Sequence, residues 1–440
     1  MSHTGRQNSF LRHNRLARGW SLRRVADEIR IIGVKENGKE PGVNADMVGE
    51  WERGIKIPSP YYREKLCQIY NATANQLGFL ADTTASSIRE SQPSMSGVLT
   101  GNNDMNKKRR ELLNLLSLAS ATLVLPFPDL DWERIEDVLI RQSQVDEDTL
   151  RDLETMNVHY WSIYRMSSSK GLVLDGVLKQ LKMLVDMLKV SHPSSQHDWL
   201  CRVTSDLSQL AGEIFFDVND YDAAQSCYVF SATAAKEAAG YDLWACALIR
   251  HSFLPIFDEQ YTEALPLLHQ AKRLAQRGDQ SLSTRFWVEA VSADAQSGIG
   301  NLTSCQRALD IAQGVLTMQG KSSNGGWLRF DDTRLLEQRG ACYVNLGQPY
   351  LAIPALQEAL TQQGVVSRRR AIILTNLAKV ALQQNEIEHA CDIVGDVIDI
   401  AIKKPSGVIS KGIYSLSTQL TPHKSLQVVK NLNQRMKLLV

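Results

Sequence analysis

The stretch that decides the fold of most of the chain is Leu336-Glu337-Gln338-Arg339-Gly340-Ala341-Cys342-Tyr343-Val344-Asn345-Leu346-Gly347. It reads as a helix that ends in a polar turn, and the helix after the turn carries Ala352 and Ala359 seven residues apart. Small side chains at this spacing share one helical face and let a neighbouring helix approach closely, while Leu356 between them fills the gap. The stretch therefore predicts an all-α fold built from pairs of packed helices.

The same pattern occurs five times at intervals of roughly forty residues, so that clear repeats span residues 197–440. The small residues of the second helices are Ala224/Ser231, Ala264/Ala271, Cys305/Ala312, Ala352/Ala359 and Ala390/Val397. We expect Pro255 and Pro354 to interrupt their helices, and a sixth pair, residues 408–420 and 425–439, to cap the array. Stacked pairs predict a superhelix whose concave side is lined by the first helix of each pair.

A different pattern lies near the N-terminus, in residues 43–54. Met47, Val48 and Trp51 share one face of a short helix, with Asn44 as its N-cap. Residues 21–29 predict another short amphipathic helix upstream. Two short helices in this order are typical of a helix-turn-helix, whose second helix lies in the major groove of DNA.

These patterns divide the chain into three parts. Residues 1–80 predict a small head of five short helices, and residues 31–42 between the two motif helices predict a surface loop. Residues 81–106, rich in Ser, Thr, Gly and Asn, predict a flexible linker. Residues 107–440 predict the helical repeat domain. Its basic-apolar opening, residues 107–125, is too short to span a bilayer and predicts a buried helix.

The distribution of charge separates the head from the rest. Residues 1–80 carry thirteen Lys and Arg against eight Asp and Glu, a net charge of +5. The whole chain has a net charge of +1, so the remainder carries −4. A basic head on a mildly acidic body is typical of a nucleic-acid-binding protein whose body has another task.

Both parts resemble known families. Residues 19–80 resemble the Cro/repressor-type (xenobiotic-response-element) helix-turn-helix domain in Ser21–Ala26, Trp51-Glu52-Arg53-Gly54 and Pro58-Ser59. The later units resemble tetratricopeptide repeats, whose superhelix is right-handed. The combination is similar to the peptide-pheromone-sensing regulators of Gram-positive bacteria, which implies a role in quorum sensing.

The helix-turn-helix resemblance implies two sets of DNA contacts. The base-contacting residues would be Asn44, Ala45, Asp46, Gly49 and Glu50. The phosphate-contacting residues would be Arg18, Arg23, Arg24, Arg53 and Lys56. We expect Glu52 instead to bond the backbone or an arginine within the domain.

The first helices of the repeats predict a ligand groove. Their polar residues are Gln209, Glu213, Arg250, Asp294, Glu337, Asn345, Asn376 and Lys379. A lining of acids, bases and amides suits an extended peptide better than an apolar metabolite. Each of these residues could equally lie on a solvated helix face. By the repeat resemblance, Asn376 is the groove asparagine whose amide holds a peptide backbone.

Several other classes of function are not expected. No constellation of nucleophile, base or paired carboxylates indicates an enzyme, so we expect no catalytic residues and no cofactor. His192 and His197 flank a short loop without further ligands nearby, so no metal site is predicted. Seven scattered cysteines indicate reduced thiols and a cytoplasmic protein, and no membrane partner is expected.

The sequence therefore predicts a ligand-responsive transcription regulator. One short reading helix covers few base pairs, so we expect a homodimer on an inverted-repeat operator in double-stranded DNA. The groove would take a short peptide. The alternative is a DNA-tethered scaffold whose repeats hold a protein partner.

Overall fold

The computed structural model describes Leu11, Asn14, Arg15, residues 20–37, 41–52, 56, 58–70, 77, 134, 138, 144–167, 173–318, 324 and 326–436. All regular structure within these residues is helical, which confirms the all-α prediction. The chain divides into two compact units, the N-terminal unit Met1–Met95 and the C-terminal unit Ser96–Val440. In the described part, no helix combines the length and the apolar character that crossing a bilayer requires.

The described helices of the N-terminal unit are α2 (Leu22–Asn37), α3 (Ala45–Glu52) and α4 (Pro60–Tyr70). They enclose one small core, to which α2 contributes Val25 and Ile29, α3 contributes Trp51 and α4 contributes Leu66. An eight-residue helix such as α3 is marginal alone in water. Its packing on this core therefore holds it in place.

The predicted loop at residues 31–42 is wrong over its first half, because α2 continues to Asn37. Apart from Gly33, neither proline nor glycine occurs in α2 before Gly38. The absence of a side chain at Gly33 instead allows a close approach: an added Cβ there would lie 2.6 Å from the Pro41 ring. The insertion thus lengthens the first motif helix.

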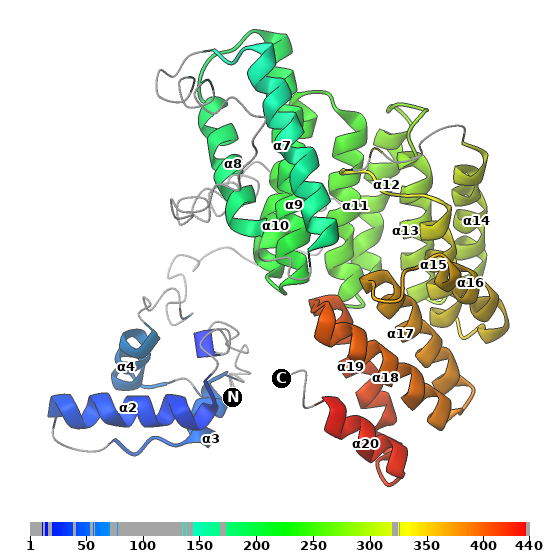
Figure 1. Ribbon diagram of the computed structural model, residues 1–440. Coiled ribbons are helices and arrows are strands. Elements are labelled where there is room, and N and C mark those ends of the chain that lie inside the picture. The colour runs from blue at the N-terminus through cyan, green and yellow to red at the C-terminus, as the bar shows by residue number, and fades with distance from the viewer. Residues whose placement is uncertain are drawn as a thin grey trace, which may run out of the picture. The chain divides into compact units, whose positions relative to one another are not determined.

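The C-terminal unit is a succession of helices that pack on their neighbours in chain order (Figure 1). They are α7 (Glu147–Met166), α8 (Leu174–Met187), α9 (Ser194–Asp217), α10 (Tyr221–Glu237), α11 (Tyr241–Phe257), α12 (Tyr261–Ala275), α13 (Thr284–Gly298), α14 (Leu302–Ala312), the 3-10 helix η2 (Gln313–Thr317), α15 (Asp332–Asn345), α16 (Pro349–Thr361), α17 (Arg368–Gln383), α18 (Ile387–Lys403), α19 (Gly407–Leu420), the 3-10 helix η3 (Thr421–His423) and α20 (Gln427–Met436). The predicted linker and the segment at residues 107–125 lie outside the described residues.

The five predicted turns share one backbone geometry. The first helix of each pair ends at a residue with positive φ: Asn219 (65°), Glu259 (60°), Gly300 (84°), Gly347 (63°) and Asn385 (61°). In each turn the next amide donates to the carbonyl five residues earlier, at 2.8 or 2.9 Å. This left-handed ending satisfies the last carbonyls of the helix. The recurrence confirms the repeat.

The predicted small residues also lie where two helices must meet. All ten side chains of the five pairs are 0 % exposed. The larger residue between each pair is 0–1 % exposed as well: Tyr228, Leu268, Leu309, Leu356 and Val394. In the fourth repeat, Leu356 packs against Gly340 of the first helix, where an added Cβ would lie 2.5 Å away. The glycine therefore makes room for the leucine.

The prolines do not interrupt their helices, contrary to the prediction. Pro255 lies within α11 and Pro354 within α16. Each removes one backbone hydrogen bond. Packing against both neighbouring helices keeps the rest of each helix in place.

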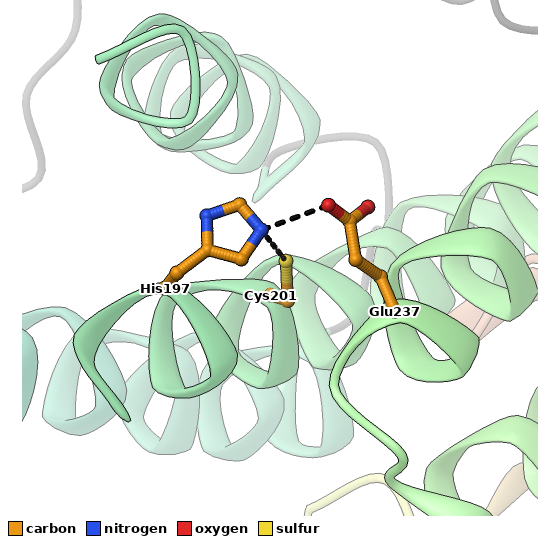
Figure 2. A group of neighbouring side chains, drawn as sticks. All are labelled: His197, Cys201 and Glu237. Carbon is orange, nitrogen blue, oxygen red and sulfur yellow. Dashed lines mark hydrogen bonds and ion pairs between the residues drawn. The ribbon is translucent and has the colours of Figure 1, made fainter. Parts of the chain in front are cut away.

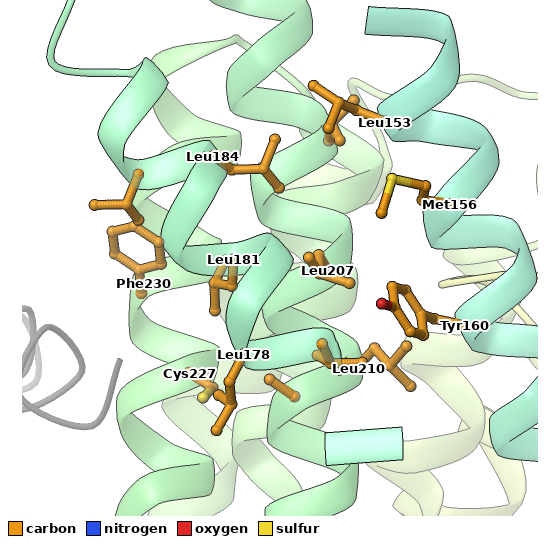
Figure 3. Packing of buried hydrophobic residues seen from close by; sticks show 14 of the residues in the cluster. Leu153, Met156, Tyr160, Leu178, Leu181, Leu184, Leu207, Leu210, Cys227 and Phe230 are labelled. Carbon is orange, nitrogen blue, oxygen red and sulfur yellow. The ribbon is translucent and has the colours of Figure 1, made fainter. Parts of the chain in front are cut away.

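The helices before the repeats extend the stack. Leu153 and Met156 of α7, Leu181 of α8 and Leu207 of α9 meet in the largest hydrophobic core (Figure 3). Asp146 caps α7 by accepting a hydrogen bond from the Thr149 amide at 2.7 Å. This layer therefore covers the first repeat pair.

Candidate functional site

The N-terminal end of α3 is the exposed part of the predicted reading helix. Asn44 and Asp46 are exposed, and Ala45 between them is half-buried. The Asn44 Oδ1 accepts a hydrogen bond from the Met47 amide at 2.9 Å, which makes Asn44 the N-cap. Its side chain therefore has a structural task besides any contact with a base.

The remaining predicted base contacts lie in other surroundings. Gly49 is buried within the unit, which corrects its assignment as a base contact. Glu50 forms an ion pair of 2.9 Å with Lys56, the predicted phosphate contact. Glu52 accepts hydrogen bonds from the Arg15 guanidinium at 2.7 and 2.8 Å, which confirms its structural role.

Of the predicted phosphate contacts, Arg23 and Arg24 are exposed in the first turn of α2. Arg24 also pairs with Glu28 one turn later, at 2.6 Å. Arg18 and Arg53 lie outside the described residues. Arg23, Arg24 and Lys56 therefore lie on the outside of the unit, where a polyanion could reach them.

The C-terminal unit encloses a cavity in two compartments that share seven lining residues, Glu213, Asp217 and Arg329 among them. The larger compartment measures about 790 Å³ and the smaller about 340 Å³. The smaller one is lined mainly from α9, α11, α13, α15, α17 and α19. These are the first helices of the pairs, as predicted for the concave face.

The smaller compartment is bounded by a buried arginine. Arg250 is 1 % exposed, and its guanidinium donates to Glu213 at 2.9 Å, to Gln209 at 2.8 Å and to the Trp327 carbonyl at 2.7 Å. The guanidinium also lies 4.9 Å from the centre of the Trp287 ring. A buried charge is tolerated only when it is paired in this way. Arg250 therefore has a structural role, because it connects α11 to α9 and to the segment at Trp327.

A second arginine, Arg329, belongs to the segment between α14 and α15 and lies near Arg250. Its guanidinium stacks 4.8 Å from the centre of the Trp161 ring and lies 3.5 Å from Glu213. Burial lowers the pKa of Arg329 to about 10, so it stays charged at neutral pH. It lines both compartments, so it contributes a positive charge to the wall of the cavity.

The wall of the larger compartment is mainly basic. Six arginines and lysines line it, against three acids: Arg165, Arg329, Arg334, Arg368, Arg369 and Lys404 against Glu213, Asp217 and Asp331. This excess of positive charge favours an anionic group in the compartment.

The last repeats close back on the first at the rim of this compartment. Asp217 at the end of α9 accepts hydrogen bonds from Arg368 at 2.5 Å and from Ser406 at 2.6 Å. Lys404 donates to the Met166 carbonyl at 3.2 Å, and Lys411 lies 3.4 Å from Asp258. These closing contacts join residues more than 150 positions apart, so the array meets itself around the cavity.

The smaller compartment has a different polar lining. It includes Asp294, whose pKa burial raises, together with Glu337 and Asn376. Glu337 forms an ion pair with Arg369. The Asn376 side chain is 8 % exposed, and no hydrogen bond joins its amide to another described residue. The amide offers both a donor and an acceptor to the cavity.

Five of the eight predicted groove residues line this compartment: Glu213, Arg250, Asp294, Glu337 and Asn376. Asn345 is exposed nearby and donates to Ser297 at 3.1 Å, and Lys379 faces the Asp294 charge. Gln209 is wrong as a groove residue, because it is 0 % exposed and its side chain bonds to Arg250 and to the Leu243 carbonyl.

The basic wall of the larger compartment was not predicted from the sequence. Arg368 and Arg369 open α17 with Arg370, where the positive end of the helix dipole disfavours cations. Such a run needs anionic partners, and Asp217 and Glu337 supply them. Three arginines at the start of a helix could therefore have indicated from the sequence that acidic partners lie nearby. Arg329 could not have been identified in this way, because it lies in a connection between two repeats.

Comparisons with known proteins concern the helical arrangement. No protein-family model matches the chain, and no curated protein matches it. Among solved structures it is similar to the apo form of the quorum sensor NprR from B. thuringiensis, with 16 % identity and a TM-score of 0.39, covering 72 % of this chain and 82 % of that one. It is also similar to a Rap protein complexed with competence and sporulation factor, with 10 % identity and a TM-score of 0.43, covering 77 % of this chain and 97 % of that one.

Proposed function

We propose that the chain is a cytoplasmic, DNA-binding transcription regulator whose C-terminal unit binds a short peptide. The observation that carries the proposal is the Asn376 amide, which lines the cavity without a partner among the described residues. A carboxamide can donate to one backbone carbonyl and accept from one backbone N–H. It therefore suits a peptide in extended form.

The charges of the cavity support a ligand with two unlike ends. The larger compartment has an excess of basic residues, whereas the smaller has Glu213, Asp217, Asp294 and Glu337 against three arginines. A charged group leaves water only where an opposite charge or a hydrogen bond replaces its hydration. A peptide that carries an acidic group toward the larger compartment meets this condition. No catalytic step is part of the proposal.

The exposed start of α3 and the cations of α2 support the DNA-binding half. Asn44 and Asp46 can contact base edges, and Arg23, Arg24 and Lys56 can contact phosphates. We propose a homodimer on an inverted repeat. A bound peptide alters DNA affinity only if it binds one state of the dimer better than the other.

Peptide binding is tested with a pool of random seven-residue peptides and the full-length protein. Peptides retained after gel filtration are identified by mass spectrometry. We expect related sequences to be enriched by the wild type, and Asn376→Ala to weaken the best of them by about tenfold or more. Asn431→Ala is the matched control, because Asn431 is exposed on α20 and outside the cavity lining. Absence of enrichment with the wild type would contradict the proposal.

DNA binding is tested by selecting bound duplexes from a random pool, with and without an enriched peptide. The expected result is a short inverted repeat whose affinity the peptide changes. A protein that co-purifies in stoichiometric amount, with no peptide enriched, would favour the DNA-tethered scaffold. The absence of any preferred duplex would remove the DNA-binding half of the proposal.

A further inference from the structure

A group of three metal-ligand side chains lies away from the cavity, where the start of α9 meets the end of α10. His197 and Cys201 are one turn apart on α9, and Glu237 is the last residue of α10. Since the two helices pack together, the end of α10 lies beside the start of α9. The ligand atoms of the three residues all lie within 4.8 Å of one another. The sequence brings the first two together and the repeat fold adds the third.

Both short contacts in this group converge on a single nitrogen. The His197 Nε2 lies 2.8 Å from the Glu237 Oε1 and 3.6 Å from the Cys201 Sγ, as the dashed lines in Figure 2 show. A ring nitrogen carries either one hydrogen or one lone pair in the plane, so it satisfies only one partner well. A hydrogen bond to Glu237 accounts for the imidazole and the carboxylate. It leaves the thiol without a strong partner.

The site is open to an entering ion. The carboxylate of Glu237 supplies one negative charge, and Cys201 supplies a second when it coordinates a divalent cation as thiolate. The imidazole side chain is 29 % exposed and the carboxylate 56 %, so an ion can enter from solvent.

We propose that His197, Cys201 and Glu237 bind a divalent transition-metal ion of the zinc class, with one coordination position left to solvent. Nitrogen, sulfur and oxygen donors from these residue types are the ligands of Zn²⁺. Tetrahedral bonds of about 2.0 Å to nitrogen and about 2.3 Å to sulfur place those two atoms roughly 3.5 Å apart, close to the observed separation. The exposed Glu237 side chain needs only a small outward shift to become the third ligand.

Binding exchanges protons for metal in a balanced step. The Cys201 thiol releases one proton to solvent and binds as thiolate. The Nε2 hydrogen of His197, which bonds to Glu237, also leaves to solvent while Nδ1 takes up one proton, so the ring binds through Nε2 as its neutral Nδ1–H tautomer. The hydrogen bond between His197 and Glu237 is replaced by two metal bonds. The ion then ties the first turn of α9 to the last turn of α10. Asp217, the acceptor of the closing contacts, lies at the other end of α9.

The test is a cobalt titration of the full-length protein, freed of metal by a chelator and kept reduced. Co²⁺ reports sulfur ligation through thiolate-to-metal charge-transfer absorption in the near ultraviolet. We expect one equivalent to produce this absorption together with visible bands of tetrahedral Co²⁺. One equivalent of Zn²⁺ should abolish both and raise the Tm.

The variants distinguish this site from the other thiols and imidazoles. Cys201→Ser should remove the charge-transfer absorption, and His197→Gln should lower the cobalt affinity by at least about tenfold. Glu237→Gln alters an exposed side chain, so a loss of affinity there cannot come from misfolding. Cys391→Ser and His269→Gln are the matched controls and should bind as the wild type does.

Cobalt binding without charge-transfer absorption would overturn the proposal, and so would unchanged binding by Cys201→Ser or by Glu237→Gln. The outcome is independent of the peptide experiment, because none of the three ligands lines the cavity.

Discussion

Two arginines, one in each unit, occupy opposite surroundings. In the N-terminal unit, Arg24 is 59 % exposed on α2 and, among the described residues, forms its ion pair with its helical neighbour Glu28. In the C-terminal unit, Arg250 is 2 % exposed in its side chain and bonds to three partners on other elements.

This difference indicates two kinds of partner. Exposed cations keep their hydration and attract a long polyanion from a distance, with an affinity that salt weakens. Enclosed cations have lost their water and select a ligand small enough to enter. Each prediction below tests this difference between exposed and enclosed charged side chains.

The largest effect is expected for Arg250→Ala. The change leaves Glu213 and Gln209 buried without their main partner, so the free energy of unfolding should fall by about 3–5 kcal/mol. Urea unfolding of the full chain, followed by tryptophan fluorescence, measures it. Arg273→Ala is the control on an exposed helix face and should change stability by less than about 0.5 kcal/mol. Equal losses of stability in the two variants would contradict the distinction between enclosed and exposed arginines.

The second effect concerns the one enclosed ion pair described in the N-terminal unit. Glu52→Ala leaves Arg15 without its bidentate partner and should destabilise that unit by about 3 kcal/mol. Hydrogen exchange of peptides from α2 to α4 should accelerate, while peptides from α9 to α18 stay protected. An unchanged exchange rate in α3 would show that the pair does not hold the reading helix.

The third effect separates two roles on the surface of the N-terminal unit. Asn44→Ser keeps an N-cap oxygen, so α3 should persist while base preference relaxes by about 1–3 kcal/mol at one base pair. Arg24→Ala should weaken binding to all duplexes and lower the salt dependence. Binding of the selected duplex and of a scrambled one, across salt concentrations, measures both. Parallel losses for the two variants would contradict the assignment.

The smallest effect concerns a buried acid, Asp206, and the dependence of stability on pH. Burial raises the pKa of Asp206 to about 6, although it accepts hydrogen bonds from Trp161 at 2.7 Å and from Asn157 at 3.0 Å. A folded-state pKa above the unfolded value gives stability that is present below about pH 4 and is lost as the pH rises through about 6. Relative to Asp206→Asn, the wild type should therefore lose about 1 kcal/mol between pH 5.5 and 7.5. An unchanged difference across this range would refute the shift.

The helix pairs could be predicted from the sequence because the repeat imposes the same contact five times. Ala264 and Ala271 share a face by spacing alone, and this fixes which side of α12 is buried. The same periodicity could not separate Gln209 from Glu213, which lie one turn apart on α9. Arg250 on α11 bonds to Gln209 and buries it. Whether each of the two residues is buried or lines the cavity therefore depends on a neighbouring helix.

The remaining features arise from segments that meet only in space. Arg329 reaches the cavity from a connection between repeats, where no periodicity applies. His192, which lies near His197 in the sequence, bonds to the Met187 carbonyl at 2.8 Å instead. The neighbours of His197 in the structure are Cys201, one turn further along α9, and Glu237, forty positions away.

The closing contacts around Asp217 have a consequence for how the molecule unfolds. A linear stack of repeats can fray from either end, and each loss is felt only by the adjacent pair. Here Arg368 and Ser406 connect the far end of the stack to its beginning. Detaching the terminal helices would therefore loosen α9 as well. We expect the array to unfold in one cooperative step and not progressively from its ends.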